Sequence, residues 1–365
     1  MKSEKNQAVD TNMHCPHCGA ALPDENAFCY QCSHFVDPET ERILEYGEVT
    51  DDDLRRLVEI NDKAWAEYNS KKGTKISFVT MVLVAIIALV GVFVLLFGSM
   101  VVGACMVGGA ILGGAVVCQI FSPPNPREWL SETRYQNCIA KYILPGVWPQ
   151  VFDQVEKYAP YSGIGKDHIK ATHLIDDRFT EGKTFDELKA VYRGRSFEFS
   201  NVKLSCLMNP MEDEPTRRKF QRVFDGYWIS CQTSLRPLYD VMVVDRNPCS
   251  GWFCTRINPD DDFDQAFAIK CKDRDYAYSL IDPRSRKILL ELRKAVGGRC
   301  FVKIGQDGIM EFGADIDNHP LLVKDIHEDP NDVRTRMLRE LQGLAAQMDL
   351  LAQLEFELLD FIYDY

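Results

Sequence analysis

The chain has 365 residues, a length that favours two or three folded units over one. Its 54 aspartates and glutamates outnumber its 42 lysines and arginines, which leaves a formal net charge of -12 at pH 7. An acidic chain repels phosphate backbones, so we expect no nucleic acid among its partners. Residues 1–12 are polar and carry both signs of charge, which is typical of neither a secretory signal nor a transit peptide.

Two Cys-x-x-Cys pairs lie near the N-terminus, Cys15 with Cys18 and Cys29 with Cys32. Tetrahedral Zn²⁺ binds four thiolates, so this spacing predicts a zinc ribbon over residues 1–40 with these four cysteines as the metal ligands. A site with four thiolates leaves no open position for water, and we therefore expect the zinc to be structural. The segment resembles the short bacterial zinc-ribbon family in Cys-Pro-His-Cys-Gly-Ala and Phe-Cys-Tyr-Gln-Cys.

Two other interpretations of this segment are a redox motif and a site with a histidine ligand. A redox Cys-x-x-Cys normally lies between the strand and helix of a thioredoxin-like unit, and that context is absent here. His14, His17 or His34 is a possible replacement ligand, but four cysteines at ribbon spacing need no substitute. The resemblance departs at Ser33, where glycine is usual. Residues 1–40 hold two lysines against six acidic residues, which favours contact with a protein over contact with nucleic acid.

Residues 41–75 are predicted to form a linker helix. Thr50 is a suitable N-cap, and the three aspartates after it suit the positive end of a helix dipole. Apolar residues then recur at imperfect helical spacing.

Residues 76–121 are predicted to form a two-helix transmembrane hairpin. No Asp, Glu, Lys or Arg occurs between Lys75 and Arg127. The apolar runs 76–97 and 101–121 each reach the roughly 20 residues that a spanning helix needs. A single buried core helix is the alternative, but two such runs in tandem exceed what this chain can cover. The sequence therefore predicts a membrane protein.

Basic residues flank the hairpin on both sides and predict its orientation. By the positive-inside rule both termini are cytoplasmic, in a multi-pass protein of the bacterial inner (cytoplasmic) membrane. Gly109 and Gly113 form a GxxxG pair that lets helices approach closely. The pair serves either packing of the two spans or a homo-oligomer.

Residues 123–324 are predicted to form a cytoplasmic α+β domain. Strands that cluster between helices favour an antiparallel sheet. The turn residues Gln306, Asp307 and Gly308 between two alternating segments predict a hairpin. We expect strands over 196–206, 223–234, 239–246, 299–304 and 309–313, and helices over 128–158 (interrupted by prolines) and 283–296.

Residues 325–365 are predicted to form an amphipathic C-terminal helix. Asp329 can cap it, and Pro330 suits its first turn. Leucine and methionine residues follow at coiled-coil spacing. The helix either packs on its own domain, which we favour, or pairs with another chain in a homo-oligomer.

The region 171–315 resembles the bacterial domain of unknown function 3137 family. The likeness rests on segments such as Ala-Thr-His-Leu-Ile-Asp from Ala171, Phe-Asp-Gly-Tyr-Trp-Ile from Phe224 and Phe-Val-Lys-Ile from Phe301. The resemblance implies a hydrophobic pair of helices ahead of the domain. It implies no catalytic residues.

The sequence contains no HExxH, GxSxG or GxGxxG motif. The hypothesis is therefore a membrane-anchored, cytoplasm-facing adaptor or sensor that binds a protein partner and carries a structural zinc ribbon. The alternative is a membrane-bound enzyme of unknown reaction. Its site would lie in the C-terminal α+β domain, at residues such as His168, Asp176, Asp177 and Arg178.

Overall fold

The computed structural model describes residues 13–22, 27–70, 130–175, 179–207, 220–246 and 261–364. The hairpin expected over 76–121, with Gly109 and Gly113, lies outside these residues. Within them, no helix is both long and apolar enough to cross a membrane. The longest described helix, α9 (Pro330–Asp364), has 35 residues but carries arginine, aspartate and glutamate side chains along its length.

The membrane-protein class and the multi-pass inner-membrane localisation are therefore corrected, because no described helix has the length and apolarity of a membrane span. The described chain is an α+β protein with a large antiparallel sheet and an N-terminal cluster of cysteines.

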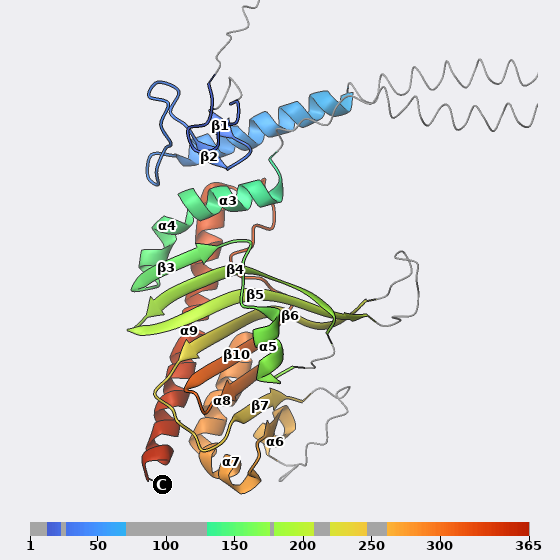
Figure 1. The fold of residues 1–365 in the computed structure, drawn as a ribbon, viewed down its shortest axis with the longest axis vertical. Helices are drawn as coiled ribbons and strands as arrows, with labels where there is room; N and C mark the ends of the chain where they lie inside the picture. Colours follow the sequence, from blue (N-terminus) through green and yellow to red (C-terminus); the bar gives the residue numbers. More distant parts are fainter. Residues whose placement is uncertain are drawn as a thin grey trace, which may run out of the picture. The chain divides into compact units, whose positions relative to one another are not determined.

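The chain divides into two compact units (Figure 1). The first comprises Met1–Leu44 and Glu48–Arg134, and the second comprises Glu45–Gly47 and Tyr135–Tyr365.

Two short strands and a helix lie entirely within the described part of the first unit. Strands β1 (Phe28–Cys29) and β2 (His34–Phe35) pair antiparallel. The helix over residues 51–70 begins at a reciprocal cap, as expected. Thr50 Oγ1 accepts the Asp53 backbone N–H, while the Asp53 carboxylate accepts the Thr50 backbone N–H at 2.8 Å.

An eight-stranded antiparallel sheet organises the second unit, in the order β3-β4-β5-β6-β10-β9-β7-β8. The strands are β3 (Gln154–Ala159), β4 (Glu181–Tyr192), β5 (Arg195–Leu207), β6 (Phe220–Gln232), β7 (Val241–Asp245), β8 (Phe267–Lys270), β9 (Arg299–Ile304) and β10 (Ile309–Asp315). The helices are α3 (Glu132–Tyr142), α4 (Leu144–Val147), the 3-10 turn η1 (Trp148–Gln150), α5 (Lys166–Thr172), α6 (Asp262–Ala266), α7 (Arg274–Leu280), α8 (Pro283–Val296) and α9.

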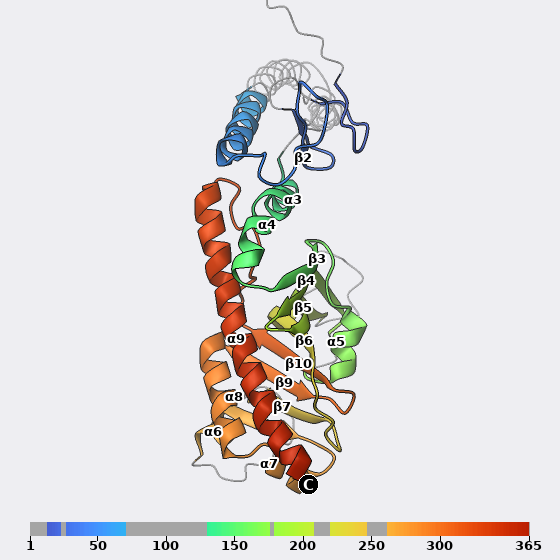
Figure 2. The ribbon, with the colours of Figure 1, turned by 90° about the vertical axis from the view of Figure 1, so that its left-hand side faces the viewer.

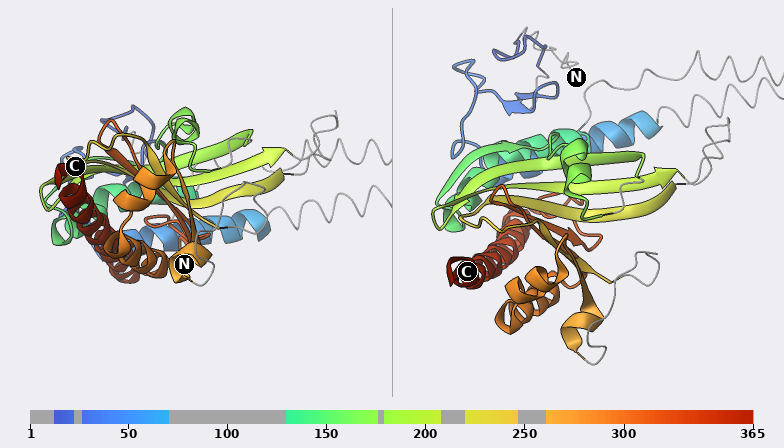
Figure 3. Two further views of the ribbon diagram at one scale, coloured as in Figure 1. Left: turned by 90° about the horizontal axis from the view of Figure 1, so that it is seen from below. Right: turned by 60° about the horizontal axis from the view of Figure 1, so that its bottom comes forward.

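The two faces of this sheet are covered unequally. Helices α8 and α9 lie side by side on one face, whereas the short helix α5 lies on the other (Figures 2 and 3). On the α9 face, Tyr227 donates a hydrogen bond to Gln347 at 2.5 Å, and Arg195 of β5 pairs with Glu355. The apolar stripe of α9 is buried: Val333, Met337, Leu341, Leu344, Met348, Leu351, Leu354 and Leu358 are each at most 3 % exposed.

The other face holds a second apolar cluster under α5. Ile169 of that helix packs with Trp228, Phe224 and Phe301 of the sheet, which are buried. The sheet residues Ser200, Trp228, Gly313, Phe301, Val244 and Ala268 pair across successive strands, so their side chains share this face. Gly313 has no side chain, and a Cβ there would come within 2.9 Å of the Trp228 ring.

Several predicted elements are confirmed. Helix α8 and strand β9 have the predicted bounds, and β10 begins where expected. The turn between β9 and β10 closes with the Gly305 N–H on the Ile309 carbonyl at 2.9 Å, and Gly308 has a φ of 82°.

The helical prediction over 128–158 is wrong at its end, where β3 forms, and β4 and β8 were not predicted. Strand β4 contains glycine, aspartate, glutamate, lysine and alanine, residues of low strand propensity. A bulge between Phe185 and Leu188 also breaks its alternation. Pairing on both sides, with β3 and β5, overrides these local preferences.

Candidate functional site

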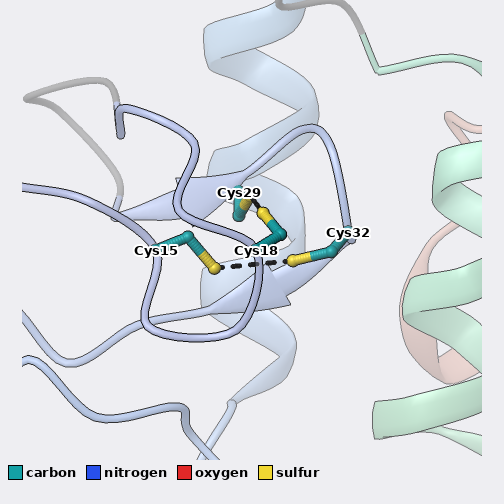
Figure 4. A group of neighbouring side chains, drawn as sticks. All are labelled: Cys15, Cys18, Cys29 and Cys32. Carbon is teal, nitrogen blue, oxygen red and sulfur yellow. Dashed lines mark hydrogen bonds between the residues drawn. The ribbon is translucent and has the colours of Figure 1, made fainter.

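Four cysteine side chains from two separate turns converge in the first unit (Figure 4). The Sγ atoms of Cys15 and Cys32 are 3.5 Å apart, and those of Cys18 and Cys29 are 3.4 Å apart. All four sulfur atoms lie within 4.8 Å of one another. The predicted ligands are therefore together.

The backbone shapes each turn around a sulfur atom. The Gly19 N–H bonds to the Cys15 carbonyl at 2.8 Å, and the Ser33 N–H bonds to the Cys29 carbonyl at 2.7 Å. Gly19 and Ser33 both have left-handed backbones, with φ values of 73° and 57°. Glycine adopts this conformation at the least cost, which explains why it is usual where Ser33 stands.

The backbone also alters the acidity of the thiols. Burial raises the pKa of Cys15, but hydrogen bonds from the N–H groups of Cys18 and His17 outweigh it, and the net shift of this pKa is downward. Burial and the neighbouring thiol of Cys29 raise the pKa of Cys32. A metal that binds here would displace thiol protons.

The donor set fits a tetrahedral metal ion such as zinc. With Zn–S distances of about 2.3 Å, ligand sulfur atoms lie about 3.8 Å apart, close to the separations seen here. Cys15 and Cys29 are only 2 % and 1 % exposed. The redox alternative fits less well, because the sulfur atoms of the two Cys-x-x-Cys pairs contact one another and form a single group of four.

Two of the three described histidines of this unit, His17 and His34, lie beside the cysteine cluster. His34 Nδ1 is 3.2 Å from the Cys32 Sγ atom, and the His17 ring centroid is 4.6 Å from that of His34. His14 pairs through its backbone with Ala21 and belongs to neither metal-type group among the described residues.

A second polar cluster surrounds Glu311 on the α5 face of the sheet. This β10 residue is only 3 % exposed. Its carboxylate is 2.7 Å from His168 Nε2, accepts the Trp228 indole N–H at 2.6 Å and accepts the Ser230 hydroxyl at 3.0 Å. His168 comes from α5, so the cluster ties this helix to the sheet.

The electrostatics of the cluster favour an ion pair. The hydrogen bond and charge of Glu311 raise the pKa of His168, against the opposing effect of burial. The Glu311 carboxylate contacts His168, Trp228 and Ser230, and so joins α5 to two strands of the sheet. Among the residues expected for an enzyme site, His168 therefore lies in a contact that joins α5 to the sheet. The other three, Asp176, Asp177 and Arg178, lie outside the described residues.

Glu311 is central to a row of paired residues that crosses the whole sheet, here called the cross-sheet row. From β3 to β8 its members are Lys157, Lys189, Glu198, Ser230, Glu311, Lys303, Met242 and Lys270. Directly paired residues of antiparallel strands point to the same face, which for Glu311 is the α5 face. Lys189 and Glu198 form an ion pair at 3.2 Å within the row.

The role of Glu311 was not predicted from the sequence. The available signal was a carboxylate in the middle of the predicted strand 309–313, because a charged residue at a buried strand position needs partners. The partners Trp228 and Ser230 lie more than 80 positions away along the chain, and sequence spacing alone does not reveal them.

Comparison with protein-family models, curated proteins and solved structures finds no match to this chain.

Proposed function

We propose that this chain is a zinc-containing adaptor that binds a protein partner and catalyses no reaction. The convergence of the four thiols carries the proposal. Cys15, Cys18, Cys29 and Cys32 would hold Zn²⁺ as a closed set of four ligands, with no position left for a substrate. The bound ion would supply folding free energy to a segment too small to fold on apolar burial alone.

Charge supports a protein partner over nucleic acid. The chain has a net charge of -12, and residues 1–40 carry an excess of acidic residues. Acidic surfaces attract basic protein surfaces and repel phosphate backbones. A partner with a basic face suits this chain best.

The α5 face of the sheet adds a broad polar surface. Lys157 is exposed, while Lys189 and Glu198 retain 41 % and 30 % of their side-chain accessibility. Charged groups spread along paired strands are suited to an extended partner surface, whereas an enclosed pocket suits a small substrate.

An enzyme is the second candidate, and His168 is the observation that favours it. This histidine has a perturbed pKa and lies beside a carboxylate, a combination found at functional sites. We rank it second because the pKa shift favours the charged imidazolium, which is a poor general base.

Membership of the domain of unknown function 3137 family remains a proposal. It rests on the resemblance of 171–315, which implies no catalytic residues and agrees with a binding role.

The test is quantitative affinity purification of the tagged full-length chain, followed by mass spectrometry. We expect a partner to be enriched by the wild type and by Cys271→Ser, whose thiol lies outside the cysteine cluster, and to be lost with Cys29→Ser. His168→Ala should retain the partner. If Cys29→Ser retains every partner while His168→Ala, still folded, abolishes the cellular phenotype, the enzyme candidate replaces the adaptor.

A further inference from the structure

A second group of metal-binding side chains adjoins the four cysteines. His17, Cys32 and His34 each present a ligand atom, and these atoms lie within 4.8 Å of one another. His17 belongs to the turn of the first Cys-x-x-Cys pair, whereas His34 begins β2 after the second pair. The fold of the ribbon therefore brings together two imidazoles that are 17 positions apart in the sequence.

We propose that His17, His34 and the Cys32 thiolate form a second, exchangeable position for a zinc-class divalent cation. The inference rests on the proposed four-cysteine zinc, with which it shares Cys32 as a bridging ligand. Imidazole and thiolate donors together suit zinc and its neighbours in the first transition series. Three protein ligands leave a fourth coordination position open to water or to a partner's side chain.

The distances between these three side chains fit coordination of a single ion. His34 Nδ1 lies 3.2 Å from the Cys32 Sγ atom. Two ligands at about 2.0 and 2.3 Å from a tetrahedral ion lie about 3.5 Å apart, so only a small adjustment separates this contact from coordination. The rings of His17 and His34 lie 4.6 Å apart at an interplanar angle of 40°.

A hydrogen bond from His34 to the Cys32 thiolate is the simpler explanation of that contact. It accounts for His34 alone. It does not account for His17, which comes from the other turn and lies with its ligand atom in the same small space. A cation between the three donors accounts for both histidines.

Exposure distinguishes the two positions. Cys15 and Cys29 of the first set are buried, whereas His17 is exposed and His34 and Cys32 are half-buried. An ion at the second position is therefore open to solvent on the side of His17. We expect it to bind and dissociate more readily than the ion held by four thiolates.

The experiment is a metal titration of the full-length, reduced, metal-free chain with Zn²⁺ and with Co²⁺. We expect two equivalents per chain for the wild type, the second at least tenfold weaker than the first. The double variant His17→Ala/His34→Ala should bind one equivalent. His14→Ala is the matched control, since it removes a histidine of the same ribbon outside the group, and should bind two.

X-ray absorption of the sample with two equivalents gives an independent measurement. Imidazole nitrogen scattering at about 2.0 Å should be present in the wild type and absent in the double variant.

Two results would overturn the second site. They are a single equivalent in the wild type and two equivalents in the double variant. If the wild type binds a single equivalent and His34→Ala weakens it, His34 is a hydrogen-bond partner of Cys32. No equivalent in the wild type would overturn the four-cysteine zinc as well, so the two proposals fail in distinguishable ways. One equivalent retained by the double variant reports that its ribbon still folds.

Discussion

Asp186 shows how a single buried carboxyl links distant segments of the second unit. It lies in the bulge of β4 with a φ of 56° and is 1 % exposed. Its carboxylate accepts the Tyr158 hydroxyl at 2.7 Å and the Asn201 amide at 2.8 Å. Asn201 in turn donates to the Pro320 carbonyl at 2.6 Å. The network joins β3, β4 and β5 to the segment that precedes α9.

Burial raises the pKa of Asp186 to about 6, although its hydrogen bonds with Tyr158 and Asn201 act in the opposite direction. The folded state therefore binds this proton more tightly than the unfolded state. The stabilisation is fully present below the unfolded pKa of about 4 and is lost as the pH rises through 6.

We predict that Asp186→Asn removes the part of the stability loss between pH 4 and pH 6 that Asp186 causes. The free energy of unfolding of the variant, relative to the wild type, should rise by about 2–3 kcal/mol between pH 4 and pH 7.5. Urea denaturation at several pH values measures it, with Asp153→Asn at an exposed position as the control. A difference that does not change with pH would contradict the assignment.

His168 gives a second prediction for a single residue. Its pKa should lie above the ordinary value of about 6.5, and Glu311→Gln should lower it, because the largest cause of the shift is removed. Glu198→Gln should lower it less, since that carboxylate acts on His168 only through space. NMR titration of the His168 ring measures this pKa in the wild type, in Glu311→Gln and in Glu198→Gln. An equal effect of the two substitutions would show that Glu311 is not the direct partner.

Among the elements, the sequence predicted those helices whose ends and buried faces are set by neighbouring residues in the chain. Helix α8 has Asp282 as its N-cap and Gly297 after its end, and both signals are visible in the sequence. The apolar spacing of α9 predicted its buried stripe. Strand β4 carries charged residues and a bulge, and it exists because β3 and β5 pair with it. Such long-range pairing is not encoded in a local pattern.

The packing of α9 can be tested with two substitutions in the same helix. Leu344 is 2 % exposed, whereas Phe356 is 62 % exposed. We predict that Leu344→Ala destabilises the second unit by about 2–5 kcal/mol, through lost apolar burial and the cavity that it leaves. Phe356→Ala should change stability by less than about 0.5 kcal/mol.

Thermal or urea unfolding of the two variants measures this difference. Equal losses would show that the stripe does not face the sheet. A change in molecular mass with Leu344→Ala would instead indicate that the stripe joins two chains.

At the scale of the whole molecule, the division into two units predicts separate responses to metal. Zinc removal should unfold the cysteine-bearing segment, whose apolar cluster consists of Cys15, Leu22, Cys29 and Val36 with a few partly buried neighbours. The eight-stranded sheet has its own core and no residue in that cluster, so it should remain folded.

Hydrogen exchange with and without a chelator tests this separation. Amide protection should fall in residues 13–22 and 27–44 and remain in β5, β6 and β10. Loss of protection throughout the sheet would contradict two independent units.

The part of the site that could be predicted is the part whose residues recur at a characteristic spacing in the sequence. Two Cys-x-x-Cys pairs predicted the cysteine cluster because the ligands of a small metal-binding fold are close in sequence. The approach of His17 to His34, and the contacts of Glu311, depend on how separate turns and strands meet. Spacing alone could not rank these residues above other histidines and glutamates.

Cys15, Cys18, Cys29 and Cys32 are proposed to hold one tightly bound zinc. The most direct measurement is elemental analysis of the purified, reduced full-length chain after dialysis against a weak chelator, beside Cys29→Ser and Cys271→Ser. One zinc per chain in the wild type and in Cys271→Ser, with none in Cys29→Ser, is the expected result. A wild-type content near zero, or full zinc in Cys29→Ser, would contradict the claim.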